Sequence, residues 1–317
     1  EISCSLVGSE MCIRDRFGAG KIASKIHEKY KEEIVAVIDN DPSKIGLYIW
    51  DDIPIISLKD YKDDYSFLPI MITTVYCKNI EKQLRDNNIT NFFIPDELWR
   101  SGNVEISQNI SHSRWPLYLK QLCDYEGKDV LEVGSRVVTG TNFRSLFEKA
   151  DYIGFDYYAG DNVDVVGDAH RLSHYFDKKF DLIFSSAVFE HLAMPWQASL
   201  EMIKLLKPGG YIFVETHYSF SSHERPWHFF QYSENALNVL FSQKFGIKCI
   251  EKGCSNPIEG YFSKEADQYL QERMVSDLFC HSEFLGQKID DIPDNKLSWE
   301  FVSLEDVVGG TKYPSNK

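Results

Sequence analysis

The chain has 317 residues, of which 43% are hydrophobic, enough for two domains of ordinary size with filled cores. Its formal net charge of −14 argues against a nucleic-acid partner, because binding to a phosphate backbone needs clustered Lys and Arg. No apolar run approaches the roughly 18 residues of a membrane span. The seven cysteines form no Cys-x-x-Cys pair, which is typical of reduced thiols. We therefore expect a cytoplasmic protein that acts on a small-molecule substrate, and its oligomeric state stays open.

Residues 1–16 differ from the rest of the chain. The sequence begins with Glu1, and Ser5–Arg16 resembles translated sequencing-adapter read-through. The segment lacks the basic leader of a signal peptide. We expect it to be non-native, to carry no strand and to contribute nothing to activity; a natural, irregular arm is the alternative.

Residues 17–95 have the order of a nucleotide-binding fold. Phe17–Gly20 holds two glycines for a tight turn, and Lys21–Tyr30 is predicted to be a helix. Asp39 is the last residue of the predicted strand Ile34–Asp39 and lies at about the distance expected for a ribose ligand. Further strands are predicted within residues 54–57, 68–75 and 91–94, and a helix at 79–88.

The strand that normally precedes such a glycine loop is missing from the pattern, so we expect a truncated Rossmann-like module. Similar modules occur in enzymes of surface-glycan synthesis. The module either binds NAD or a nucleotide sugar, or has a structural or docking role. Residues 96–113, which are mixed and polar, form the expected linker.

Residues 114–317 show a second alternating α/β pattern. Short apolar runs within 129–135, 152–156 and 163–170 end in an acidic residue or a glycine, as buried parallel strands do where they open onto a ligand. Further strands are predicted at 180–186 and 282–288 and within 206–216 after the break at Pro208-Gly-Gly, and helices at 117–125, 141–149, 195–206, 234–242 and 263–279. The last helix has an apolar stripe that covers the site or packs in the core.

Carboxylates at the predicted strand ends indicate how a nucleotide-like ligand is held. Gly134 lets the backbone approach the ligand, and Asp156 follows Glu132 by about one strand-helix-strand unit, where a carboxylate takes both ribose hydroxyls. Asp168 ends the next strand and is placed to receive an adenine amine.

The four motifs at 129–135, 152–156, 180–192 and 206–216 resemble those of the class I S-adenosylmethionine-dependent methyltransferases, particularly the small-molecule and glycan-pathway group. The resemblance covers roughly Lys128 to Ile250. It departs from the usual Gly-x-Gly-x-Gly loop, because Gly134 is followed by Ser-Arg-Val-Val-Thr before Gly140. The expected fold class is thus α/β, with two doubly wound Rossmann-like domains, the second of them a class I methyltransferase fold.

The resemblance implies S-adenosylmethionine as cofactor and a set of cofactor-binding residues: Glu132, Gly134, Ser135, Gly140, Asp156, Tyr157, Asp168, Ala169 and Ser185. Other interpretations stay open for several of them. In these interpretations, nearby backbone groups form the hydrogen bonds of Glu132, and Asp156 and Asp168 cap helices. Ser185 is then only a residue at the end of its strand.

Histidines follow the fourth and fifth strands of this domain. His191 and His217 are the candidate catalytic bases, with structural packing as the alternative. The resemblance to a substrate loop implies that His223, Trp227 and His228 contact the acceptor. No metal is expected, because transfer from a sulfonium depends mainly on alignment.

The leading hypothesis is S-adenosylmethionine-dependent methyl transfer to a small molecule, for which a sugar or glycan precursor is one acceptor class. An oxidoreductase or epimerase that uses NAD or a nucleotide sugar at residues 17–39 is the second hypothesis. A third is a non-catalytic binding protein whose altered glycine loop holds no cofactor.

Overall fold

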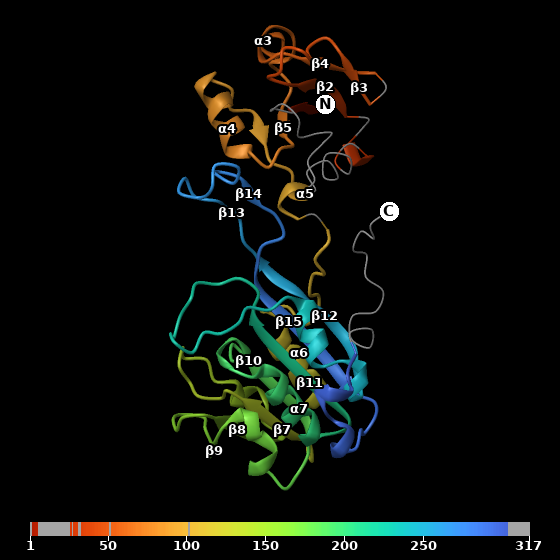
Figure 1. The fold of residues 1–317 in the computed structure, drawn as a ribbon, viewed down its shortest axis with the longest axis vertical. Coiled ribbons are helices and arrows are strands. Elements are labelled where there is room, and N and C mark those ends of the chain that lie inside the picture. The colour runs from red at the N-terminus through yellow and green to blue at the C-terminus, as the bar shows by residue number, and fades with distance from the viewer. Residues whose placement is uncertain are drawn as a thin grey trace. The chain divides into compact units, whose positions relative to one another are not determined.

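The computed structural model describes residues 2–5, 26, 28–30, 33–50, 52–100 and 102–303. The chain groups into two compact units. Unit 1 contains residues 1–104 and 258–278, and unit 2 contains residues 105–257 and 279–317. Figure 1 shows the elements of both. The predicted loop Phe17–Gly20 and most of the predicted helix after it lie outside the described residues.

A six-stranded sheet in the order β3-β4-β2-β1-β5-β6 forms the centre of unit 1. Its strands are β1 (Ile2–Ser5), β2 (Ile34–Ile38), β3 (Tyr48–Ile49), β4 (Ile53–Ile56), β5 (Ile70–Ile72) and β6 (Phe92–Phe93). The helices are α3 (Leu58–Asp60), η1 (Tyr61–Tyr65), α4 (Cys77–Asp86) and α5 (Asp96–Trp99). All pairs are parallel except β3 with β4.

Strand β1 pairs with β2 on one side and β5 on the other. The expectation that residues 1–16 carry no strand is therefore wrong for Ile2–Ser5. The physical reason is that ladder hydrogen bonds use backbone groups, and a position between two parallel strands offers partners to either edge of almost any short extended segment.

The segment 258–278 leaves unit 2 and packs into unit 1. It contains the antiparallel strands β13 (Gly260–Tyr261) and β14 (Met274–Val275) rather than the predicted helix 263–279, so that prediction is wrong. Backbone amides decide the conformation: Met274 N–H donates to the Val75 carbonyl (2.8 Å), and Asp277 N–H donates to the Trp99 carbonyl (2.8 Å). These long-range bonds override the local helical spacing of the apolar residues.

Met274 is 3% exposed and belongs to the hydrophobic core of unit 1, beside Cys77 and Ile80. Met274→Ala should lower the free energy of unfolding of unit 1 by about 2–5 kcal/mol, because it leaves a cavity in that core. Hydrogen exchange followed peptide by peptide measures the effect. Faster exchange should appear in β2, β5 and α4; equal acceleration throughout unit 2 would contradict the assignment of residues 258–278 to unit 1.

Unit 2 is built on a seven-stranded sheet in the order β12-β15-β11-β10-β7-β8-β9. Its strands are β7 (Asp129–Val133), β8 (Asp151–Asp156), β9 (Val165–Val166), β10 (Phe180–Ser186), β11 (Leu206–His217), β12 (Ile247–Pro257) and β15 (Phe279–Lys288). The pairs are parallel except for those that β15 forms with β11 and β12. This sheet is consistent with the class I methyltransferase fold.

Helical segments connect these strands. They are α6 (Trp115–Cys123), η2 (Phe143–Leu146), η3 (Ala169–Tyr175), η4 (Phe189–His191), α7 (Pro195–Leu205), α8 (Glu234–Leu240), η5 (Gln243–Phe245), η6 (Asp294–Lys296) and η7 (Trp299–Phe301). The predicted helix 141–149 is reduced to the single turn η2, which Asn142 caps at its start. In the part of the chain that the structure describes, no helix is long and apolar enough to cross a membrane.

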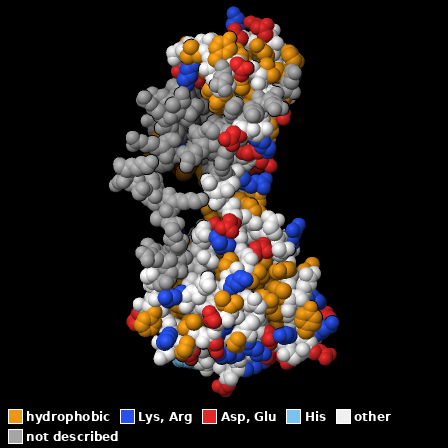
Figure 2. All heavy atoms as spheres, turned by 90° about the vertical axis from the view of Figure 1, so that its right-hand side faces the viewer, with side chains coloured by type: hydrophobic (Ala, Val, Ile, Leu, Met, Phe, Trp, Pro, Cys, Tyr) orange, Lys and Arg blue, Asp and Glu red, His pale blue; other side chains and the backbone are white. Residues whose placement is uncertain are grey.

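Apolar side chains alternate between two cores along the central strands. In β10, Ile183 packs in the core that contains α7 and α8, whereas Leu182 and Phe184 pack in the core that contains Trp115 and Leu119 of α6. This period of two buries both faces of the sheet and leaves the strand ends for polar side chains. Figure 2 shows basic, acidic and hydrophobic side chains mixed over the displayed face of unit 2.

Residues 105–113, expected in the linker, are bonded into unit 2. Ile106 forms a bridge with Cys254, and the Ser107 hydroxyl donates to Glu283 (2.7 Å). The backbone amides of Gln108 and Asn109 donate to the Glu251 carboxylate at 2.7 and 2.9 Å. The chain that enters the sheet is thereby fixed beside β12 and β15.

Candidate functional site

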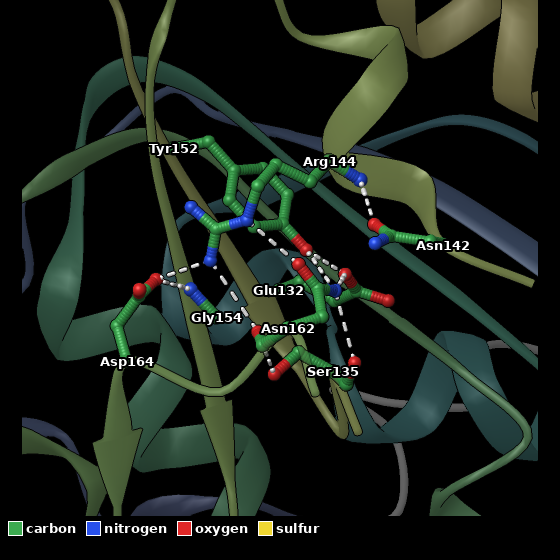
Figure 3. A network of polar contacts seen from close by, with 8 residues as sticks. All are labelled: Glu132, Ser135, Asn142, Arg144, Tyr152, Gly154, Asn162 and Asp164. Atoms are coloured by element: carbon green, nitrogen blue, oxygen red, sulfur yellow. Dashed lines mark hydrogen bonds and ion pairs between the residues drawn. The ribbon is translucent and has the colours of Figure 1, made fainter. Parts of the chain in front are cut away.

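A polar network surrounds Glu132 where β7 ends (Figure 3). Glu132 is 4% exposed, and its Oε2 accepts hydrogen bonds from the Tyr152 hydroxyl and from Asn162 Nδ2, the latter at 3.2 Å. Asn162 also donates to the Ser135 carbonyl at 2.9 Å. The carboxylate is thus held by two side chains and connects through Asn162 to the glycine loop.

Arg144 closes this network from the side of η2. Its Nε donates to Asn162 Oδ1 at 2.8 Å, and its guanidinium pairs with Asp164 and lies over the Tyr152 ring at 4.5 Å. Asp164 in turn accepts from the Gly154 amide at 2.7 Å. Sequence reasoning missed these residues. Their only local signal is that Asn162 and Asp164 flank the start of the apolar run predicted within 163–170.

Burial raises the pKa of Glu132 to about 8, and the charge of Asp156 acts in the same direction. The hydrogen bond from Asn162 and the charge of Arg144 lower the pKa of Glu132, but they offset only part of the effect of burial. Glu132 therefore holds a proton at neutral pH in the folded protein.

This raised pKa makes stability depend on pH. Between the ordinary value of 4.5 and about 8, the folded protein binds a proton that the unfolded chain has lost, so this contribution to stability falls as pH rises. Glu132→Gln removes the titration and should be more stable than the parent at pH 8, by roughly 2–4 kcal/mol, with the advantage shrinking towards pH 4.5. Denaturant unfolding at several pH values measures it. The exposed Glu148→Gln is the control, and a difference that is constant with pH would disprove the assignment.

The glycine loop is closed between β7 and β8. The amides of Gly134 and Ser135 both donate to the Phe155 carbonyl, at 2.8 and 3.1 Å. Gly134 has φ of +89°, and a Cβ there would lie 2.1 Å from a Val188 methyl, so only glycine fits. Gly140 also has φ of +89°, with open space around its Cα.

Asp156 ends β8 and binds the loop that follows the glycines. It accepts from the Arg136 amide at 3.2 Å and from the Tyr158 amide at 2.9 Å. Arg136 Nε, a buried atom with no hydrogen bond among the described residues, lies 3.6 Å from the same carboxylate. Tyr157 is exposed. The carboxylate therefore has lone pairs beyond those that the two amides use, and Arg136 Nε is paired with it only at a distance longer than a hydrogen bond.

The remaining predicted cofactor residues have local partners. Asp168 caps η3 through the His170 amide at 2.9 Å, and these bonds and the nearby His170 outweigh burial and lower the pKa of Asp168. Ala169 begins η3 and packs against the core. The Ser185 hydroxyl donates to the Val133 carbonyl at 2.8 Å, which ties β10 to β7.

The candidate catalytic histidines meet at Glu190, which follows β10 and is completely buried. His217 Nδ1 lies 2.9 Å from Glu190 Oε1 and His191 Nε2 lies 3.9 Å from it. Glu190 Oε2 accepts from the Thr216 hydroxyl at 2.6 Å. Burial opposes ionisation of Glu190, but the interactions with His217 and Thr216 outweigh it and lower its pKa.

The loop after β11 brings two more histidines to this place. The His223 ring lies 5.2 Å from the His217 ring, 4.8 Å from the His191 ring and 4.7 Å from the His228 ring. His191 Nδ1 bonds the Trp227 carbonyl at 2.9 Å, whereas the Trp227 side chain is exposed. Burial and the neighbouring His223 and His191 lower the pKa of His228.

A second buried carboxylate lies two residues before His217. Glu215 accepts from His112 Nδ1 at 2.8 Å, from Trp115 Nε1 at 3.0 Å and from the Ser186 hydroxyl at 2.9 Å. The bond to Glu215 outweighs desolvation and raises the pKa of His112. The sequence indicated none of these partners except Ser186, because they come from α6 and the segment before it.

Glu215 faces another carboxylate across the sheet. It pairs directly with Glu283 of β15, and burial, together with the charge of Glu215, raises the pKa of Glu283 to about 7. Like charges on directly opposite residues are destabilising. Hydrogen bonds from the Ser107 and Ser255 hydroxyls to Glu283 offset part of this repulsion.

Comparison with known proteins identifies a methyltransferase domain in part of unit 2. Residues 132–214 match the family model described as Methyltransferase domain. No curated protein matches the chain. The match begins at Glu132 and ends in β11, so it spans the strand-end carboxylates and the Glu190 segment.

Several solved structures match part of this chain. The plantazolicin methyltransferase BamL is 15% identical, with 55% of this chain and 85% of that chain covered and a TM-score of 0.40. The N-methyltransferase NodS of Bradyrhizobium japonicum, solved with S-adenosyl-L-homocysteine, is 14% identical, with 55% and 84% covered and a TM-score of 0.36. YcgJ of Bacillus subtilis is 18% identical, with 56% and 99% covered and a TM-score of 0.38.

The prediction of an S-adenosylmethionine-dependent methyltransferase is confirmed. The acceptor and the roles of single residues are matters for proposal.

Proposed function

We propose that unit 2 binds S-adenosylmethionine at the ends of β7 and β8 and transfers its methyl group to a small-molecule acceptor held by the loop 218–230. The observation that carries the proposal is the gathering of polar side chains at the carboxyl ends of β7, β8, β10 and β11. Ligands of open α/β sheets bind outside these ends, near the point where strand order reverses. Here that point lies between β7 and β10.

Cofactor and acceptor take different parts of this edge. Asp156 and Arg136 offer an acceptor and a donor to the ribose, and Asp168 is assigned to the adenine. The histidines beside Glu190 lie after β10 and β11, and His191 or His217 receives the proton of an oxygen or nitrogen nucleophile. Trp227, Phe220 and Phe229 are exposed aromatic rings near them, suited to the face of a sugar or another ring.

Asp156→Ala should weaken the binding of S-adenosylmethionine by about 1.5–3 kcal/mol, roughly tenfold or more, because a bidentate contact to the ribose is lost. Isothermal titration calorimetry measures it. The matched control is Asp151→Ala, an exposed carboxylate at the other end of the same strand. Equal affinity of the folded Asp156 variant and the control would remove Asp156 from the cofactor site.

Trp227→Ala should raise the Michaelis constant for the acceptor and leave cofactor affinity unchanged, because the exposed ring contacts only the acceptor. Methyl transfer from radiolabelled S-adenosylmethionine to a panel of sugars and nucleotide sugars first identifies a working acceptor. Ile289→Ala, an exposed residue beyond the far end of β15, is the control. Weaker cofactor binding with normal acceptor kinetics would place the loop in the nucleotide pocket instead.

The second hypothesis assigns NAD or a nucleotide sugar to unit 1. Its glycine loop lies outside the described residues. Asp39 already accepts from the Asp41 amide at 2.9 Å and from Lys44 at 3.2 Å, which leaves it less free to hold a ribose. Calorimetry with NAD tests this hypothesis, and S-adenosylmethionine in the same assay tests the non-catalytic alternative.

A further inference from the structure

We propose that Glu190, His217 and His223 bind a divalent transition-metal ion of the zinc type, with His191 and His228 beside it. One ligand atom from each of Glu190, His217 and His223 lies within 4.8 Å of the others, and the same holds for His191, His223 and His228. The two sets share His223, so five side chains surround one small region. The sequence analysis expected no metal, and the proposal departs from that expectation.

Two buried atoms in this region lack hydrogen bonds. Glu190 Oε1 and His217 Nδ1 are 2.9 Å apart but do not meet hydrogen-bond geometry with each other or with any described residue. A buried polar atom without a well-formed hydrogen bond is destabilising, because nothing offsets its loss of hydration. A cation between a carboxylate oxygen and an imidazole nitrogen satisfies both atoms at once.

The separations suit a tetrahedral ion. With bonds of about 2.0–2.1 Å, two ligand atoms on a tetrahedral zinc ion lie about 3.3 Å apart. Glu190 Oε1 lies 2.9 Å from His217 Nδ1, and the ligand atom of His223 lies within 4.8 Å of both. Small side-chain rotations therefore suffice to bring these atoms onto one ion.

The outer hydrogen bonds prepare the histidines as ligands. His191 Nδ1 donates to the Trp227 carbonyl at 2.9 Å, and His223 Nδ1 donates to the Ser221 carbonyl at 3.0 Å. A carbonyl only accepts, so each Nδ1 carries the proton and each Nε2 keeps its lone pair. This pattern, in which the second ring nitrogen donates to a carbonyl, is common among metal-bound histidines.

The carboxylate is oriented in the same way. Thr216 donates to Glu190 Oε2 at 2.6 Å and leaves Oε1 directed at the histidines. The backbone carbonyl of Glu190 accepts from the Phe229 amide at 2.8 Å, which fixes the loop that carries His223 and His228. Nitrogen and carboxylate donors in this combination favour Zn²⁺ or Co²⁺ over Mg²⁺ or Ca²⁺, which prefer oxygen alone.

A role for the ion rests on the proposed function. Three protein ligands leave a coordination position open, and a metal lowers the pKa of a hydroxyl bound there. The proposal then narrows the acceptor to molecules with a hydroxyl oxygen that enters this position, and it leaves His191, rather than the metal-bound His217, to receive the proton.

The test measures metal binding directly. The full chain, without a polyhistidine tag and stripped with a chelator, is titrated with ZnCl₂ by calorimetry and with CoCl₂ by visible absorption. We expect one ion per chain and the intense absorption bands of tetrahedral cobalt. His217→Ala and His223→Ala should each weaken binding by at least about 10–100-fold. His174→Ala, an exposed histidine of η3, should bind as the parent does.

Circular dichroism confirms that each variant is folded, and Glu190→Gln, which keeps the shape of the side chain, serves where an alanine variant does not fold. No binding at micromolar metal, or equal affinity in His223→Ala and His174→Ala, overturns the proposal. Calorimetry of the stripped parent with S-adenosylmethionine separates the two proposals. Cofactor binding without metal binding removes only the metal site, whereas metal binding without cofactor binding removes only the proposed function.

Discussion

The desolvation of carboxylates at one edge of a sheet is the constraint on which the structure of unit 2 depends. Glu132, Glu190, Glu215 and Glu283 are each at most 4% exposed. An isolated buried charge is too costly to persist, so each must be neutralised or surrounded by donors. Glu132 and Glu283 have raised pKa values, whereas Glu190 and Glu215 are surrounded by histidine, threonine, tryptophan and serine side chains. Hydrogen bonds to these carboxylates hold the segment before α6 and the loops after the strands in place.

Much of the fold of unit 2 could be predicted because a parallel strand buried on both faces appears as a continuous apolar run. β10 and β11 lie at the apolar runs that the sequence indicates, and the antiparallel β15 contains the predicted strand 282–288. The predictions fail where the local spacing of apolar residues favours one structure and hydrogen-bond partners distant in sequence favour another. An apolar stripe at 270, 274 and 278 fits a helix, but the carbonyls of Val75 and Trp99, far away in sequence, impose an extended backbone. No local pattern contains that information.

The candidate site divides in the same way. Carboxylates and histidines at strand ends could be singled out, since a strand end is a local feature. Their partners could not, because Tyr152, Asn162 and His112 are ordinary polar residues in sequence and acquire a role only through the strand order. The alternative interpretations of Asp168 and Ser185 describe their observed contacts, a helix cap and a tie between strands.

Because residues 258–278 belong to unit 1, the order in which the two units are completed differs from the order in which they are synthesised. The core of unit 1 includes Met274, which the ribosome adds about 170 residues after residue 104. At about 5–20 residues per second, the first unit waits roughly 10–35 s for its last strand pair, while most of unit 2 has already emerged. The amino-terminal unit, the first to be made, is therefore among the last parts of the protein to be completed, and a cut anywhere between the units cannot release it whole.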